Sequence, residues 1–430
     1  MEDYGLFSLS ESLKTNTTLT NLNLEGNNWG DSIAPFFLSE IVKTNATLTT
    51  LNLRNNSQNS FSSKCLSFAL RTNGTLTSLD LGSTGINVQA LSEGLKVNTA
   101  LTSLNLASNG IGDSGAKALS DVLQVNATLT KLHLGWNGIG AEGTQYICKA
   151  LAGNNTLTSL DFSWNEIGGA GALFLSEALQ SNKALNDLNL NFIQTDERGA
   201  ICLFDALKHN TTLSTLDLTG LGAVLVTSKK SMHVPFCHLL DALKVNTTLS
   251  CLRLGKCQTL SPSDAQLFFS SLMDNKTLKE LDLNELFPRF KVPPEFLASN
   301  TTLTHLNLSS SLSEDPSVLA PFFEALSVNS TLTCLKLADV EIMDSNCSRS
   351  KIGDSECEWI SETLKVNTTL TDLDLSLNSI GKVGVKCIMG ALKVNTSLKF
   401  LNLCCQREGY RSVTNPPSVR KVNTSVFVYW

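Results

Sequence analysis

The sequence predicts an α/β solenoid, a right-handed horseshoe with a parallel sheet on its concave side and helices outside. Two observations carry this prediction. A Leu-x-Leu pair, once written Leu-x-Phe, recurs fourteen times from Leu22/Leu24 to Leu401/Leu403, and successive pairs are most often 28 residues apart. Between the pairs, apolar residues recur at helical spacing. A fixed period of about 20 to 29 residues, with leucines at strand spacing, is typical of stacked repeats.

The repeat from residue 101 to 128 shows how one unit is built. Leu104 and Leu106 alternate with Asn105 at the period of a strand, so we expect the leucines to face the core and Asn105 to face solvent. The second half of the unit has its apolar residues on one face of a helix, and these are Ala116, Leu119, Val122 and Leu123. Asp113 or Ser114 is expected to cap this helix. A single unit cannot bury its own apolar face, so neighbouring units must stack.

An asparagine three residues after the second leucine marks many of the repeats. These residues are Asn27, Asn56, Asn109, Asn137, Asn165 and Asn378. We expect each side-chain amide to satisfy backbone groups left open where the strand bends into its loop. The 28-residue unit, with helices of the type IGDSGAKALSDVL (residues 111–123), resembles the ribonuclease-inhibitor class of leucine-rich repeats, which NOD-like receptors and the Ran GTPase-activating protein also contain. The resemblance covers essentially the whole chain and implies a leucine-rich-repeat solenoid that serves as a protein-binding scaffold.

Unbroken periodicity predicts one elongated domain over residues 1–403, with about 14 repeats. Two repeats are longer than the others, which predicts loops at residues 223–235 and 341–350. Residues 404–430 are expected to form an irregular tail, in which residues 423–430 have the composition of a vestigial strand. The first helix, expected over residues 5–13, has no polar cap, which fits either a free-standing repeat array or a fragment of a longer product.

We expect a soluble, cytoplasmic and monomeric protein without membrane contact. The N-terminus lacks the basic region and apolar core of a secretory signal, and no run approaches the roughly 18 apolar residues of a membrane span. The twelve cysteines have no regular spacing and are expected to be mostly reduced thiols. The sixteen Asn-x-Ser/Thr sequences lie mostly in the turn that the repeat dictates, so they do not indicate secretion.

Motifs that suggest cofactor or metal chemistry are explained by the repeat. Gly110-x-Gly112-x-x-Gly115 matches a dinucleotide fingerprint, but the pattern returns one repeat later at Gly138, whereas a true fingerprint occurs once. The five histidines share no metal-ligand spacing, and the sequence contains no Cys-x-x-Cys pair and no Walker motif. We therefore predict no cofactor, no metal and no enzymatic activity, while a Cys–His pair assembled from distant repeats stays open.

The outward positions of the predicted strands carry eleven acidic and five basic residues, in line with the net charge of −6 for the whole chain. An anionic partner such as nucleic acid is therefore disfavoured, and we expect a protein partner that is not strongly acidic. Between the paired leucines, the residue is Asn six times and Asp five times. The alternative interpretation is that Asn and Asp are simply the solvated consensus of this repeat.

Three consecutive repeats break the polar pattern of the concave face. Trp136, Trp164 and Phe192 occupy the same position, two residues after the second strand anchor, at intervals of 28 residues. We expect them to stack as a row at the strand-to-loop edge, and exposed aromatic rows are typical binding anchors. The alternative is that the rings lie flat over the loops and extend the core. The polar residues expected to contact a protein partner around this row are Lys131, His133, Ser159, Asp161 and Asp187.

We therefore predict a non-enzymatic recognition module that binds a protein on its concave face. The resemblance implies a role related to NOD-like receptor sensing or signalling. A second hypothesis is GTPase activation resembling that of the Ran GTPase-activating protein. The long acidic tail usual in that family is absent here, since Arg411, Arg420 and Lys421 make this tail basic. A third hypothesis is a pathogen effector that mimics host repeat proteins.

Overall fold

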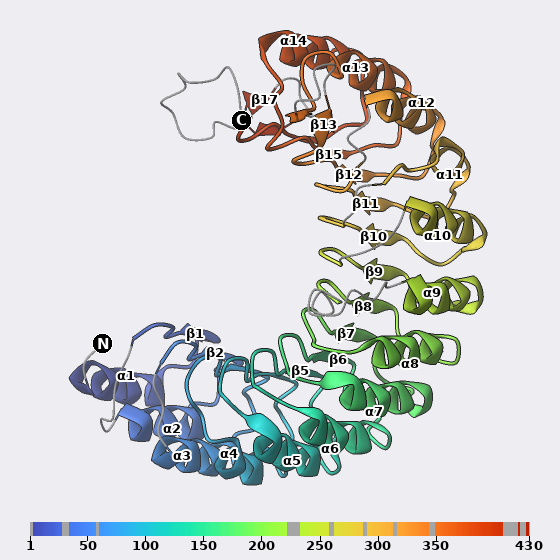
Figure 1. Cartoon of the computed structure of the whole chain (residues 1–430). Helices are drawn as coiled ribbons and strands as arrows, with labels where there is room; N and C mark the ends of the chain where they lie inside the picture. Colours follow the sequence, from blue (N-terminus) through green and yellow to red (C-terminus); the bar gives the residue numbers. More distant parts are fainter. Residues whose placement is uncertain are drawn as a thin grey trace. The chain divides into compact units, whose positions relative to one another are not determined.

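The computed structural model describes residues 3–27, 34–56, 60–221, 233–257, 262–286, 290–312, 316–343, 349–406, 420–421 and 427–429. The chain forms two compact units, Met1–Asp217 (unit 1) and Leu218–Trp430 (unit 2). Within each unit, short strands lie side by side in one layer and helices lie in a second layer (Figure 1). This arrangement confirms the predicted fold class, an α/β leucine-rich-repeat solenoid.

Unit 1 alternates helices with three-residue strands. Its helices are α1 (Asp3–Thr15), α2 (Ala34–Thr44), α3 (Ser60–Leu70), α4 (Val88–Leu95), α5 (Gly112–Leu123), α6 (Ala141–Leu151), α7 (Gly168–Ser181) and α8 (Glu197–Leu207). Its strands are β1 (Asn21–Asn23), β2 (Thr50–Asn52), β3 (Ser78–Asp80), β4 (Ser103–Asn105), β5 (Lys131–His133), β6 (Ser159–Asp161), β7 (Asp187–Asn189) and β8 (Thr215–Asp217). The strands pair in parallel in chain order from β1 to β8.

Unit 2 repeats this pattern with less regular lengths. Its helices are α9 (His233–Val245), α10 (Pro262–Asp274), α11 (Pro294–Ser299), the 3-10 turn η2 (Pro316–Val318), α12 (Leu319–Val328), α13 (Cys357–Val366) and α14 (Lys382–Ala391). Its parallel strands, in order, are β9 (Cys251–Arg253), β10 (Glu280–Asp282), β11 (His305–Asn307), β12 (Cys334–Lys336), β15 (Asp372–Asp374), β16 (Phe400–Asn402) and β18 (Phe427–Tyr429). β17 (Arg420–Lys421) pairs antiparallel with β18.

Leucines fill the space between the strands and the helices. Leu104 and Leu106 of the fourth repeat are fully buried, and Leu119 of helix α5 reaches the same core with 1% exposure. The register places Leu104 beside Leu132 of β5, and Leu132 beside Leu160 of β6. Equivalent leucines therefore form continuous rows, and each repeat buries the apolar face of its neighbour.

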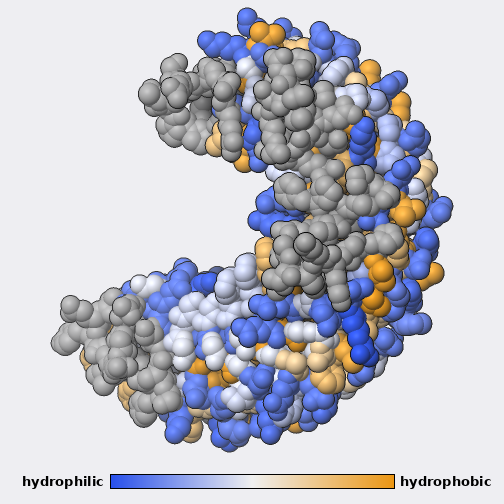
Figure 2. All heavy atoms as spheres, viewed as in Figure 1, coloured by the Kyte–Doolittle hydropathy of each residue, from blue (hydrophilic) through white to orange (hydrophobic). Residues whose placement is uncertain are grey.

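The outer surface of both units is largely hydrophilic, with hydrophobic residues in scattered patches over the helices (Figure 2). Several exposed apolar side chains are valines that precede the turn after a helix: Val97, Val125, Val245, Val328, Val366 and Val394. In the described part of the chain, every helix is too short or too polar to cross a membrane.

The loop asparagines join each repeat to the one before it. Asn137 donates through Nδ2 to the carbonyl oxygen of Leu134 in its own repeat (2.9 Å) and to that of Leu106 in the preceding repeat (3.0 Å). Its Oδ1 accepts from the backbone N–H of Asn109 in the preceding repeat (2.8 Å). The same pair of carbonyl contacts is made by Asn56, Asn109, Asn165 and Asn378. The structure thus confirms that these amides satisfy backbone groups at the strand ends.

A second set of asparagines lies in the turn between each helix and the next strand. Asn126 is 7% exposed, and its Nδ2 donates to the carbonyl oxygen of Leu95 in the preceding repeat (2.8 Å). Its Oδ1 accepts from the backbone N–H groups of Thr128 (3.0 Å) and Leu129 (2.8 Å). Equivalent contacts are made by Asn45, Asn73, Asn98, Asn154, Asn210, Asn275, Asn367 and Asn395. Asn126 and all of these except Asn98 begin an Asn-x-Ser/Thr sequence, so repeat packing explains the asparagine of half of the sixteen.

The expectation that Asp113 or Ser114 caps helix α5 is wrong. The N-cap position of α5 is Ile111, which makes no side-chain cap hydrogen bond. Asp113 Oδ1 instead accepts from the backbone N–H groups of Gly140 (2.8 Å) and Gly143 (2.9 Å), at the start of helix α6 in the next repeat. A Cβ at Gly143 would lie 2.5 Å from Asp113 Oδ1, so this contact requires glycine there.

The two long repeats differ in part from the expected loops. A loop is predicted at residues 341–350, yet residues 341–343 and 349–350 belong to an antiparallel pair of strands, β13 (Glu341–Met343) and β14 (Arg349–Lys351). Residues 344–348, between these two strands, lie outside the described residues. In the other long repeat, residues 233–235 belong to helix α9, and residues 223–232 lie outside the described residues.

The C-terminal segment contributes a further strand to the sheet of unit 2. β18 pairs in parallel with β16, with Leu401 beside Val428. Residues 407–419, 422–426 and 430 of the tail lie outside the described residues.

Truncation of Leu104 to alanine should lower the free energy of unfolding by about 2–5 kcal/mol, because it leaves a cavity in a fully buried row. Asn105→Ala in the same strand removes two hydrogen bonds, from Asn105 Nδ2 to Asp80 Oδ2 and from the Ala107 N–H to Asn105 Oδ1. It should cost about 1 kcal/mol. Urea unfolding of both variants beside the wild type measures the difference, and equal losses would contradict the strand orientation.

Asp113→Ala should destabilise helix α6 rather than α5, by about 1 kcal/mol, because α6 loses the acceptor at its first turn. Hydrogen exchange at the Gly143 amide should accelerate while the amides of α5 keep their protection. Ser114→Ala, at the exposed neighbouring position, is the matched control. Faster exchange confined to α5 would show that the cap has been assigned to the wrong helix.

Candidate functional site

The position two residues after the second strand anchor is left-handed in every repeat. The backbone φ lies between +50° and +74° at Gly26, Asn55, Ser83, Ser108, Trp136, Trp164, Phe192, Gly220, Lys256, Glu285, Ser310, Asp339, Leu377 and Cys405. This conformation turns the chain from the strand into its loop. It suits glycine and asparagine, whereas other residues pay about 1–2 kcal/mol to adopt it. The turn therefore requires a left-handed backbone at this position, and it does not require an aromatic side chain.

Trp136, Trp164 and Phe192 stack on one another at this position. The ring centroids are 4.2 Å apart in both pairs, and the ring planes differ by 14° and 21°. Trp136 is 57% exposed and Trp164 is 39% exposed, whereas Phe192 is half-buried. The 28-residue spacing predicts this row. Because the ring faces cover one another, the ring edges and the outer face of Trp136 are what the row offers to a partner.

The backbone cost of the row is at least as large as its stacking energy. A tryptophan or phenylalanine in the left-handed region costs about 1–2 kcal/mol relative to glycine, or about 3–6 kcal/mol for the three residues. Each stacked pair returns about 0.5–1.5 kcal/mol beyond the area that it buries, or about 1–3 kcal/mol for the two pairs. Stacking therefore does not account for three aromatic residues at this position.

The five polar residues predicted around the row lie together on strands β5, β6 and β7 of unit 1. In register, Ser159 lies between Lys131 and Asp187, and His133 lies beside Asp161. Ser159 Oγ donates to Asp187 Oδ2 at 2.9 Å, and His133 Nδ1 is 3.7 Å from Asp161 Oδ2. Lys131 is exposed. These residues form one polar patch, and the aromatic row follows it at the C-terminal ends of the strands.

Asp161 connects the polar patch with the loop that carries Trp164. Its Oδ1 accepts from the backbone N–H of Ser163 at 3.0 Å. Partial burial opposes ionisation of Asp161, but the nearby His133 ring and the hydrogen bonds from Ser163 outweigh it and lower the pKa of Asp161 below its usual value of 3.8. Asp161 is therefore a fixed negative charge at neutral pH.

Outward Asn and Asp residues close the turn at the end of their strands. In ten of the described repeats, the Oδ1 of this residue accepts from the backbone N–H two residues later, at 2.8–3.1 Å. This Asx turn requires a side-chain oxygen, so the Asn/Asp consensus has a structural cause. His133, Arg253 and Lys336 have no side-chain oxygen, so these three residues cannot accept the Asx-turn hydrogen bond.

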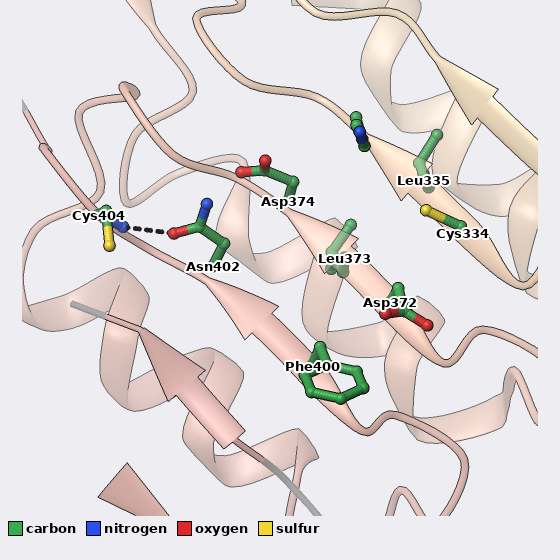
Figure 3. Close-up of a pocket in the computed structure, with 9 residues that line it drawn as sticks. Cys334, Leu335, Asp372, Leu373, Asp374, Phe400, Asn402 and Cys404 are labelled. Atoms are coloured by element: carbon green, nitrogen blue, oxygen red, sulfur yellow. Dashed lines mark hydrogen bonds between the residues drawn. The ribbon is translucent and has the colours of Figure 1, made fainter. Parts of the chain in front are cut away.

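Sequence reasoning missed a cavity of about 340 Å³ over β12, β15 and β16 of unit 2 (Figure 3). Its lining residues are Cys334, Leu335, Lys336, Asp372, Leu373, Asp374, Phe400, Asn402 and Cys404. The signal for it is the register, because Cys334, Asp372 and Phe400 occupy equivalent outward positions on neighbouring strands. A 38-residue spacing between the leucine pairs of β12 and β15 hides this alignment in the sequence.

The sequence patterns considered for chemistry have structural explanations. Gly110 and Gly112 of the dinucleotide-like pattern have φ of +62° and +57° and turn the chain towards helix α5. Burial raises the pKa of the Cys148 thiol and raises that of Cys357 to about 12, so both are poor nucleophiles. Within the described ranges, His, Cys, Asp and Glu form no cluster of three or more that could hold a metal ion.

Stability should depend on the charge of Asp161 below about pH 4. Its folded pKa is depressed, so ionised Asp161 stabilises the fold at higher pH, and this contribution is lost as the pH falls through the folded pKa. Asp161→Asn keeps the acceptor for the Ser163 N–H and removes only the charge. Urea unfolding between pH 3 and 5.5 should show a wild-type advantage that shrinks towards pH 3. An advantage that grows as the pH falls would refute the assignment.

The comparisons with known proteins concern the repeats. The Leucine Rich repeat family matches residues 97–120, 125–148, 153–176 and 366–389. A search of curated proteins finds no match. Among solved structures, the chain is similar to an internalin from Listeria monocytogenes, with 18% identity and a TM-score of 0.41, over 88% of this chain and 86% of the internalin. It is also similar to leiomodin-1 actin-binding site 2, with 24% identity and a TM-score of 0.30, over 36% of this chain and 86% of that chain. The family matches identify these four segments as leucine-rich repeats.

Proposed function

We propose that this protein is a non-enzymatic interaction scaffold that binds a protein partner on the strand face of unit 1. The stacked row of Trp136, Trp164 and Phe192 is the observation that carries this proposal. Its two tryptophans keep 57% and 39% of their surface exposed, at a position where glycine or asparagine would cost less. Tryptophan is among the residues most enriched at the energetic centres of protein interfaces. An exposed row of little value for folding is best explained by binding.

The contact chemistry follows from the row and the polar patch beside it. Ring edges carry partial positive charge, so they favour apolar groups, aromatic faces and carbonyl oxygens of a partner. The Asp161 and Asp187 carboxylates lie on the neighbouring strands and disfavour a strongly acidic partner. Lys131, exposed on β5, supplies a donor at the edge of the patch. The partner is therefore a protein surface with an apolar or aromatic centre and a polar rim.

We also propose that the repeats belong to the ribonuclease-inhibitor-like class. Each repeat of unit 1 combines a three-residue strand with an α-helix, and this supports repeats of the ribonuclease-inhibitor-like class. That class would give the protein a sensing or signalling role related to NOD-like receptors, carried out as a cytoplasmic monomer without a cofactor or nucleic acid.

The test is a double variant, Trp136→Ala/Trp164→Ala, used beside the wild type for affinity capture and then for titration with the captured protein after purification. If the row anchors the partner, affinity should fall about 30-fold or more, which corresponds to about 2 kcal/mol. The free energy of unfolding should fall by about 1–3 kcal/mol, because both stacked pairs are lost while alanine keeps the cost of the left-handed backbone.

Leu377→Ala provides the matched control. Leu377 is 41% exposed, and it occupies the same left-handed position in unit 2. Its loss should leave partner affinity unchanged. A double variant that is strongly destabilised and still binds its partner normally would instead favour the alternative in which the rings extend the core.

A further inference from the structure

The cavity over β12, β15 and β16 combines an apolar floor, one aromatic wall and a charged rim. Leu335 and Leu373 lie at its base and are 0% and 3% exposed. Phe400, 42% exposed, lies beside Asp372 in register at one end (Figure 3). Asp374 lies beside Asn402 at the other end. At about 340 Å³, the cavity is within the range of pockets that enclose small groups.

The two carboxylates of the rim each keep one oxygen without a protein partner in the described part of the chain. Asp372 Oδ2 accepts from Thr371 Oγ1 at 2.5 Å, which leaves Oδ1. Asp374 Oδ1 accepts from the backbone N–H of Ser376 at 2.9 Å, which leaves Oδ2. Residues two apart on a strand project from the same face about 6.5 Å apart, and both Asp372 and Asp374 line the cavity.

The charge around the cavity is negative despite the presence of one lysine. Asp372 and Asp374 face Lys336, the one basic side chain among the lining residues. Burial raises the pKa of the Cys334 thiol on the neighbouring strand; Asp372 raises it further, and the opposing effect of Lys336 is smaller than that of Asp372. With two carboxylates and one lysine among the lining residues, the cavity carries a net negative charge.

We propose that this cavity binds an arginine side chain of a protein partner. The guanidinium group carries five N–H donors in a planar fork, which can reach the open oxygens of Asp372 and Asp374. Its flat face can stack against the Phe400 ring, and its methylene stem can lie on the leucine floor. An anionic group would be repelled by two carboxylates, and a neutral apolar group would cover both of them without giving either a hydrogen-bond partner.

This inference rests on the proposed function, because it takes the bound molecule to be a protein, and it adds a second contact in unit 2. Lys336 allows a specific test of arginine binding in the cavity. Lys336 lies beside Asp374 in register, and it stands where most repeats have Asn or Asp. Since Lys336 repels a bound cation, its replacement by a neutral residue should strengthen arginine binding.

The experiment uses the full chain and a blocked amino acid, N-acetyl-arginine methylamide, in a saturation-transfer NMR titration. N-acetyl-citrulline methylamide is the matched neutral probe, since it has the same length and shape without the charge. The arginine probe should bind saturably, with a dissociation constant on the order of 1 mM, and at least tenfold more tightly than the citrulline probe. Its affinity should fall as salt is raised.

The variants separate this site from its alternatives. Asp372→Asn/Asp374→Asn keeps the side-chain oxygen of the Ser376 turn contact and should weaken the arginine probe at least tenfold. Lys336→Gln should strengthen it about threefold, and Asp80→Asn, at the equivalent turn position of unit 1, should leave it unchanged. Equal binding of the two probes, or arginine binding unaffected by the double variant, would overturn the inference.

The result is also distinguishable from failure of the proposed function. Trp136→Ala/Trp164→Ala should leave probe binding unchanged, because those residues do not line the cavity. If that variant loses its protein partner while the probes fail to discriminate, the inference about the cavity fails alone.

Discussion

The buried asparagine amides at the ends of each strand are the interaction on which the rest of this structure depends. A solenoid repeat contacts only its neighbours, so its backbone groups must be satisfied within one repeat of distance. Asn137 and Asn126 act at opposite ends of strand β5, and each donates to a carbonyl oxygen of the preceding repeat. Removing such a side chain leaves buried carbonyl oxygens without a donor, at about 1–3 kcal/mol each. This requirement fixes strand length and register, and through them the position of every outward side chain.

The same requirement limits where the surface can vary. The left-handed residue and the Asx turn are set by the backbone, so most Asn, Asp and glycine residues at the strand ends are there for folding. Residues that depart from this rule are therefore informative. Trp136 and Trp164 occupy a left-handed position at a cost, and Lys336 gives up the Asx turn. Trp136 and Trp164 form the proposed binding row of unit 1, and Lys336 lines the cavity of unit 2.

The sequence was sufficient for the fold and for part of the site, because both follow from a period. Leu104 and Leu106 are buried as predicted, and Trp136, Trp164 and Phe192 stack because they share one position in repeats of equal length. Contacts between repeats were harder to predict. Asp113 looked like the cap of its own helix because capping rules are local in sequence, whereas its acceptor oxygen serves the helix of the next repeat.

The cavity of unit 2 could not be predicted from the sequence for a related reason. It depends on which unlike residues the strand register brings together. The antiparallel pair of β13 and β14 lengthens one repeat without disturbing the pairing of β12 with β15, so Cys334 and Asp372 become neighbours across 38 residues. A period search finds positions that repeat the same chemistry. It does not find positions where neighbouring strands contribute different chemistry to one hollow, as Phe400 and Asp374 do.

The spacing of the aromatic row shows how the sheet and the surface are coupled. Neighbouring strands lie about 4.8 Å apart, which is wider than the contact distance of two aromatic rings. The ring centroids are 4.2 Å apart in both pairs, so the rings of Trp136, Trp164 and Phe192 lean together beyond the strand ends. Rings held in this way lose little freedom when a partner covers them, because the stack has already ordered them. The row is therefore preorganised for binding, and the cost of that order is met when the chain folds.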